Sequence, residues 1–163
     1  MWRPRRSHPI GRTHGVSTSG RLSLTVVLCT VAYIESPRLF AQDEAAFRVV
    51  TNEANPVSTL SRGQVSRIFF RKTLTWDDGR QMAPVDQMPN SAARQAFSRT
   101  IHGKAVQSVQ AYWMQLLYSG RAVPPPELGS DADVIVFVKS NPGAIGYVSS
   151  SASSGGVKVL EVK

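Results

Sequence analysis

The chain has 163 residues, with 19 Lys and Arg against 11 Asp and Glu and a formal net charge of +8. Residues 1–41 hold six of these basic residues and one acidic residue, so residues 42–163 keep 13 basic against 10 acidic residues, a net charge of +3. The charge of this larger part therefore gives no support to a nucleic-acid partner. Residues 42–163 also lack cysteine and contain one histidine, His102. Thiol catalysis, a disulfide framework and a His/Cys zinc site are thereby excluded from residues 42–163.

The N-terminal segment has the pattern of a secretory signal peptide. Several arginines precede an apolar run at 22–34, and residues 39–41, Leu-Phe-Ala, lead into a polar stretch. A basic start, a short apolar centre and a small residue before the cut are the three parts of such a signal. We expect residues 1–41 to be the signal peptide, cleavage after Ala41, and a periplasmic or secreted location. The alternative is an uncleaved N-terminal anchor, which would be the protein's one membrane contact.

Residues 42–163 alternate between strand-like and helix-like segments. Strands are predicted at 47–51, 82–85, 144–148 and 157–162, and helices at 62–70, 91–102, 106–118 and 130–138. The helix at 106–118 has the clearest apolar period of 3.6 residues. This order of elements predicts one α/β domain with a mixed sheet and flanking helices.

Two of the predicted helices carry informative ends. Ser61 and Gln64 have capping-box spacing, and Leu60 and Val65 are placed to form a hydrophobic staple. Whether Ser58, Thr59 and Ser61 also line a ligand site is left open, since they could be simple caps. His102 precedes Gly103 at the end of another helix, where a cationic imidazole would interact favourably with the helix dipole. We assign His102 no catalytic role.

The stretch at 84–97 has the order expected of an anion-binding site. A strand meets a polar break at 86–90, and a helix then begins with Asn90 or Ser91 as its N-cap. The first N–H groups of a helix have no intrahelical partner and carry partial positive charge. Arg94 follows one turn later, with a fork of donors that suits an oxyanion. The alternative is an ordinary cap followed by a solvated arginine.

Three motifs resemble the substrate-binding proteins of phosphate ABC transporters. They are Leu60-Ser61-x-x-Gln64-Val65-x-x-Ile68-Phe69-x-x-Lys72-x-x-x-Trp76-x-Asp78-Gly79, Ser91-Ala92-Ala93-Arg94-x-x-Phe97, and Asn141-Pro142-Gly143-Ala144-Ile145-Gly146-Tyr147-Val148. The second is similar to the family's Ser-Gly-Thr-Arg-x-x-Phe, and the third to its Pro-Gly-Ala-Ile-Gly-Tyr strand. Their order and spacing cover nearly all of residues 47–150.

The resemblance implies one lobe of a type II periplasmic binding protein, with phosphate or a related oxyanion as ligand. Carried over by position, Ser91 and Arg94 are ligand contacts, and Asn90 stands where the motif usually has a glycine. We expect Asp86 to orient Arg94 or to accept a hydrogen bond from a protonated anion. Transfer of the ligand to an ABC permease is implied by the family alone. No cofactor is expected, and no enzymatic activity, because no nucleophile with a base and an orienting group is visible.

A second function stays open because the chain departs from the family pattern. Ala92 and Ala93 replace the family's Gly and Thr, and full members are more than twice as long. The chain could therefore be an interaction or accessory module that keeps the fold without the ligand, with an apolar partner surface around Trp76, Tyr118 and Tyr147. If a lone lobe does bind phosphate, tight binding requires a second lobe, from a homodimer or from another protein.

Overall fold

The computed structural model describes residues 46–163, and the expected signal peptide lies outside these residues. The elements in chain order are β1 (Phe47–Thr51), β2 (Thr59–Leu60), α1 (Arg62–Phe69), β3 (Ala83–Pro84), β4 (Asp86–Gln87), α2 (Ala92–Phe97), the π-helix η1 (Ser98–His102), α3 (Val106–Tyr118), β5 (Glu127–Leu128), α4 (Asp131–Ser140), β6 (Ala144–Ser149) and β7 (Lys158–Val162). The predicted mixed α/β class is confirmed.

The central sheet has five strands in the order β2-β7-β1-β6-β3. Strand β1 runs antiparallel to both neighbours, and Val49 lies opposite Tyr147 of β6 and Leu160 of β7. The short edge strands β2 and β3 run parallel to β7 and β6. Strands β4 and β5 form a separate parallel pair. Strand β4, which precedes α2, is therefore not part of the main sheet.

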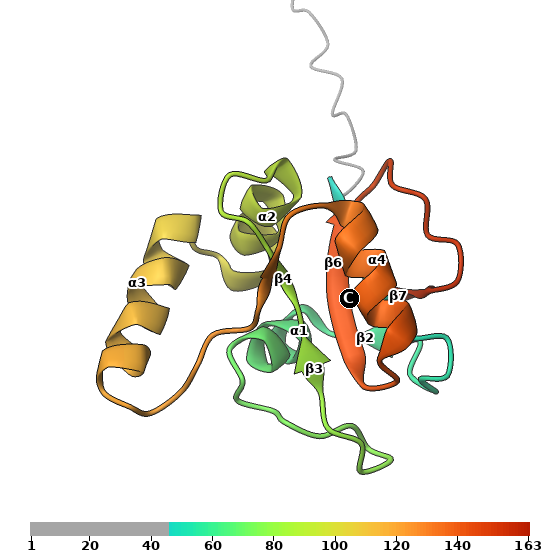
Figure 1. The fold of residues 1–163 in the computed structure, drawn as a ribbon, viewed down its shortest axis with the longest axis horizontal. Coiled ribbons are helices and arrows are strands. Elements are labelled where there is room, and N and C mark those ends of the chain that lie inside the picture. Colours follow the sequence, from blue (N-terminus) through green and yellow to red (C-terminus); the bar gives the residue numbers. More distant parts are fainter. Residues whose placement is uncertain (1–45) are drawn as a thin grey trace, which may run out of the picture. The chain divides into compact units, whose positions relative to one another are not determined.

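One face of the sheet carries the larger apolar core. Side chains alternate between the two faces of a strand, so Phe47 and Val49 of β1 share this face with Ile145 and Tyr147 of β6. Helices α1, α2 and η1 cover it. These helices contribute six apolar side chains to this core: Val65, Ile68, Phe69, Ala93, Phe97 and Ile101. This packing fixes α2 beside β1 and β6 (Figure 1).

The opposite face is covered by α4. Val50 of β1 and Val148 of β6 pack there against Val134 and Val138 of α4. Gly146 of β6 lies within this layer, and a Cβ at that position would come within 2.8 Å of Val134. The missing side chain thus lets α4 approach the sheet closely. The result is three layers, with helices on both sides of the sheet.

The helix starts predicted from local sequence are confirmed. Ser61 accepts a hydrogen bond from the N–H of Gln64, and the Gln64 side chain accepts one from the N–H of Ser61, which completes the capping box. Ser130 likewise accepts from the N–H of Asp133 at the start of α4. Ser61 is therefore the N-cap of α1, which was one of the two roles considered for it above.

The predicted helix at 91–102 is divided. Helix α2 ends at Phe97 and continues as the wider turn of η1, which stops at Gly103 with a φ of 62°. Three short strands, β2, β4 and β5, were not predicted, and β4 lies where a polar break was expected. Each has two residues and pairs with a strand distant in sequence, so its own residues carry no periodic signal.

The explanation of His102 as a cation at a helix end is wrong. Its ring lies between Phe70 and Phe97, at centroid distances of 4.4 and 5.3 Å, and Nδ1 is 2.9 Å from Oγ of Ser66. Burial, together with the charges of Arg94 and Lys104, lowers the pKa of His102 to about 4. His102 is therefore neutral near pH 7 and serves as a packing residue.

Candidate functional site

The candidate site lies at the turn that connects β4 to α2. Ser91 is the N-cap of α2, and its Oγ accepts a hydrogen bond of 3.3 Å from the N–H of Arg94. The same hydroxyl donates to Oε1 of Gln87 at 2.5 Å. Asn90 lies in the turn before the cap and is exposed. Of the two residues predicted as N-cap, Ser91 is the one.

Arg94 is buried and paired with Asp86. Its Nη1 donates to Oδ2 of Asp86 and lies 3.5 Å from the hydroxyl of Tyr147. Its Nε is buried and has no hydrogen-bond partner within residues 46–163. The interpretation of Arg94 as a solvated side chain is therefore wrong, and its guanidinium is paired with Asp86.

Tyr147 completes this buried cluster from β6. Its hydroxyl donates to Oδ1 of Asp86 and accepts from the N–H of Gln87 at 3.2 Å. Its ring stacks on Phe97, with centroids 3.9 Å apart and planes at 8°. Tyr147 thus connects the sheet to both β4 and α2. Tyr147 and Trp76 are buried, so the apolar partner surface expected around Trp76, Tyr118 and Tyr147 does not exist in that form; only Tyr118 of the three is exposed.

A second polar group extends the cluster toward α4. The side-chain amide of Gln87 donates to Oδ1 of Asp131 at 2.8 Å and to the carbonyl of Tyr147 at 3.0 Å. Asp131, the first residue of α4, also accepts from the N–H and the hydroxyl of Ser149. One hydrogen-bonded chain therefore joins Ser91, Gln87 and Asp131.

The pKa values in the cluster follow from burial and from these bonds. Burial raises the pKa of Tyr147, so its hydroxyl remains a donor at neutral pH. Burial lowers the pKa of Arg94, and the charges of Tyr147 and Glu127 act in the opposite sense but do not outweigh it. For Asp131, burial raises the pKa, but the hydrogen bonds from Ser149 and Gln87 outweigh this, and the net pKa is lowered.

The N–H groups of the first two residues of α2 have no hydrogen-bond partner among the described residues. Within the described residues, no hydrogen-bond acceptor lies at the N–H groups of Ala92 and Ala93, as expected for the first turn of a helix. Ala92 is exposed and Ala93 is buried. These two donors and the unpartnered Nε of Arg94 are the groups that remain for an anion, since the Ser91 hydroxyl already bonds Gln87 and Arg94.

The structure brings three of the four predicted site residues together. Asp86 contacts Arg94 directly, and Ser91 joins them through its cap bond to Arg94. Asn90 makes no side-chain hydrogen bond within the part of the chain that the structure describes. Gln87 and Asp131 were not predicted, and Tyr147 was interpreted as structural. The described residues contain no group of three or more His, Cys, Asp or Glu side chains that could hold a metal ion.

A comparison with known protein families gives no match, and neither does one with curated proteins. Solved structures do match. An ABC-type phosphate transport receptor from Vibrio cholerae is 20% identical, with a TM-score of 0.58 over 72% of this chain and 46% of its own. A putative phosphate ABC transporter substrate-binding protein with bound phosphate, from Clostridium perfringens, is 23% identical, with a TM-score of 0.57 over 72% of this chain and 44% of its own. A possible phosphate binding protein from Planctomyces limnophilus is 15% identical, with a TM-score of 0.55 over 72% of this chain and 41% of its own.

The fold is that of one lobe of a periplasmic binding protein. The resemblance to phosphate ABC transporter substrate-binding proteins that the sequence motifs indicated is confirmed at the level of the fold. The chain spans less than half the length of these solved structures. Among residues 46–163, no helix is both long and apolar enough to cross a membrane.

Proposed function

We propose that this protein is an exported, non-catalytic solute-binding protein that holds phosphate or a related tetrahedral oxyanion at the start of α2. The N–H groups of Ala92 and Ala93 donate to the anion, and Arg94 supplies the positive charge. Asp86 holds Arg94 in place. Delivery of the ligand to an ABC permease is part of the same proposal, supported by the names of the proteins that share the fold.

The observation that carries the proposal is the buried Arg94 with an unpartnered Nε, one turn inside a helix start with two open amides. Burying a guanidinium donor without an acceptor costs free energy. The free N–H groups at a helix start also favour an anion.

The expected affinity is low. Two or three charge-assisted hydrogen bonds contribute about 4 to 8 kcal/mol in total, while association costs at least about 4 kcal/mol. The difference corresponds to a Kd of about 1 mM or weaker. A second lobe, from a second copy of the chain or from another protein, is required for tight binding.

Calorimetric titration of the purified protein with phosphate and sulfate tests the proposal. The informative variant is Ala92→Pro, which removes one open N–H. Proline is favoured at the first position of a helix, and Ser91 already has the extended backbone that precedes proline, with ψ of 135°. Ala92→Ser keeps the N–H and is the matched control.

The proposal predicts saturable phosphate binding that Ala92→Pro weakens by about tenfold, the value of one charge-assisted hydrogen bond, and that Ala92→Ser retains. Absence of saturable binding up to tens of millimolar would contradict it, as would equal weakening by both variants.

A second candidate function is an interaction module, favoured by the surface of α3. This is the one helix of the described chain without a charged residue, and Met114, Leu117 and Tyr118 on it are 46%, 45% and 81% exposed. The occupant that suits this face is a second copy of the chain, because contact through an uncharged helix places no like charges directly against each other.

Analytical ultracentrifugation over a range of concentrations tests this second candidate. A dimer that Leu117→Lys dissociates, while Val136→Lys on the exposed side of α4 leaves it intact, would support it. A monomer at all concentrations would contradict it.

A further inference from the structure

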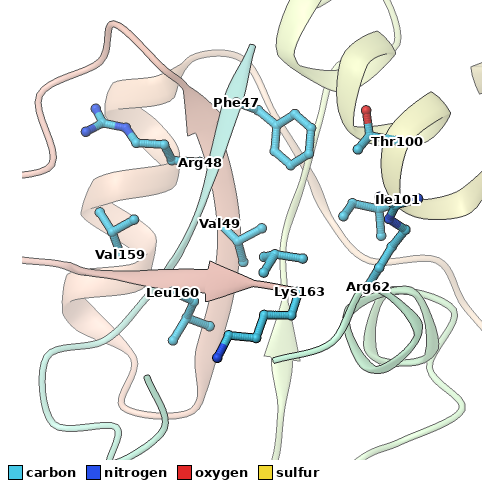
Figure 2. Close-up of a pocket in the computed structure, with 10 residues that line it drawn as sticks. Phe47, Arg48, Val49, Arg62, Thr100, Ile101, Val159, Leu160 and Lys163 are labelled. Carbon is cyan, nitrogen blue, oxygen red and sulfur yellow. The ribbon is translucent and has the colours of Figure 1, made fainter. Parts of the chain in front are cut away.

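A separate pocket lies on the larger-core face of the sheet, away from Ser91 and Arg94. It has a volume of about 350 Å³ and opens between β1, β7, the start of α1 and η1 (Figure 2). The sheet side is formed by Phe47, Val49 and Leu160, and the helix side by Ile101. All four side chains are at most 5% exposed and belong to the core. The walls are therefore fixed by packing and apolar.

The rim of the pocket carries positive charge. Arg62 and Lys163 line it together with the hydroxyl-bearing Thr100. Figure 2 shows Arg62 and Thr100 beside Ile101, whereas the side chain of Arg48 points to the other side of β1. Asp, Glu and His are absent from the residues that line the pocket.

Arg62 is the cation that a ligand can use. Within residues 46–163, Lys163 forms an ion pair with Glu161 at 3.7 Å, whereas the Arg62 guanidinium forms no ion pair or hydrogen bond. The backbone N–H of Arg62 donates to the carbonyl of Lys163 at 2.7 Å, which fixes the start of α1 against the end of β7. The hydroxyl of Thr100 also has no partner in the described part of the chain. The cation of Arg62 and the hydroxyl of Thr100 thus lie beside the apolar side chains that line the pocket.

We infer that this pocket binds a small amphipathic anion, namely a monocarboxylate with a compact aliphatic or aromatic body. The body lies against Phe47, Val49 and Ile101, and the carboxylate lies between Arg62 and Thr100. The volume is at the lower end of the range of small-molecule sites, about 300 to 1,000 Å³, which limits the body to the size of an octanoate chain or a phenyl ring. Such pockets combine apolar walls with a few polar groups that orient the ligand.

This site is distinct from the proposed oxyanion site. A hydrated phosphate gains little from an apolar floor, and the two sites share no residue. Binding of a monocarboxylate therefore does not depend on whether phosphate binds at α2.

The test is a titration of the purified full-length protein with octanoate, followed by calorimetry and by methyl NMR. Octanol tests the need for the charge, and phosphate tests the separation of the sites. Arg62→Gln removes the charge at the rim. Arg67→Gln is the matched control, since Arg67 is also exposed on α1 but does not line the pocket. Both positions are on the surface, so both variants keep the core intact.

We expect saturable octanoate binding, with methyl shifts at Val49, Ile101 and Leu160. Arg62→Gln weakens it by about tenfold, the usual size of one charge-assisted contact, while Arg67→Gln leaves it unchanged, octanol binds less tightly, and excess phosphate does not compete. The inference is overturned if octanoate does not saturate, if both arginine variants weaken it equally, or if the shifts lie outside the pocket.

Discussion

Arg94 of α2 and Asp86 of β4 form an ion pair inside the protein, with side chains that are 2% and 5% exposed. Taking both charges out of water is costly, and removal of one partner leaves the other charge buried without compensation. The pair also fixes the position of α2 relative to β4. Stability and the proposed anion site therefore depend on the same two side chains.

Arg94→Met is expected to lower the free energy of unfolding by about 3 to 5 kcal/mol, because it leaves the Asp86 carboxylate unpaired. The double variant Asp86→Asn/Arg94→Met is expected to cost less than Arg94→Met alone, because the introduced amide is neutral and still accepts from Tyr147 and Gln87. Urea unfolding measures both values.

The control for this experiment is Arg99→Met, since Arg99 is exposed on η1 and forms no ion pair within residues 46–163. Its effect is expected to be within about 0.5 kcal/mol. A cost for Arg94→Met as small as that of Arg99→Met would contradict the importance of the buried pair.

Gly146→Ala is expected to destabilise the protein by about 1 to 3 kcal/mol, because overpacking of a filled core has this cost. The added Cβ would lie 2.8 Å from a methyl of Val134 and 2.9 Å from one of Val85. Gly63→Ala in α1 is the control. A Cβ there meets nothing within 4 Å, so this change is expected to stabilise the helix by about 0.5 to 1 kcal/mol. Thermal unfolding of the two variants would show opposite signs, and equal signs would contradict the packing described here.

The pH dependence of stability should contain a contribution from His102. Its pKa is about 4 in the folded protein, against an ordinary value of 6.5 for a solvated histidine, so the unfolded chain binds the proton more readily. This contribution is absent above pH 6.5, and stability falls as the pH drops from 6.5 to 4, by up to about 3 kcal/mol. His102→Phe should reduce the slope between pH 6.5 and 5. An NMR titration of His102 that gives a pKa near 6.5 would refute this.

The parts of the fold that could be predicted from sequence are those determined by neighbouring residues. Helix starts were predicted at Ser61, at Asn90 or Ser91, and at Ser130. Ser61, Ser91 and Ser130 are the observed N-caps, because an N-cap bonds to amides two or three residues away. Strands β2, β4 and β5 could not be predicted in the same way. Thr59–Leu60 is a strand only because Glu161 and Val162 lie beside it.

The candidate site shows the same limit. Asp86, Ser91 and Arg94 lie within nine positions of one another, so the local order of strand, turn and helix was enough to predict them as site residues. The contacts of Gln87 with Asp131 and Tyr147 join residues 44 and 60 positions apart. No local pattern indicates such a contact, and the Gly-Tyr-Val motif around Tyr147 was interpreted as part of the fold. The burial of Trp76 was missed for the same reason, since its indole donates to the distant carbonyl of Gly143.

The most direct test of the central claim is an NMR titration of the ¹⁵N-labelled protein with phosphate, which follows the amides of Ala92 and Ala93 and the side-chain Nε–H of Arg94. Binding at the start of α2 predicts saturable shifts of these three signals together, with an apparent Kd of about 1 mM or weaker. In Ala92→Pro the remaining signals of Ala93 and Arg94 are expected to report binding about tenfold weaker, whereas Ala92→Ser is expected to bind as the unchanged protein does. Shifts that do not saturate, or that are confined to exposed lysine and arginine side chains, would contradict an oxyanion site at this helix.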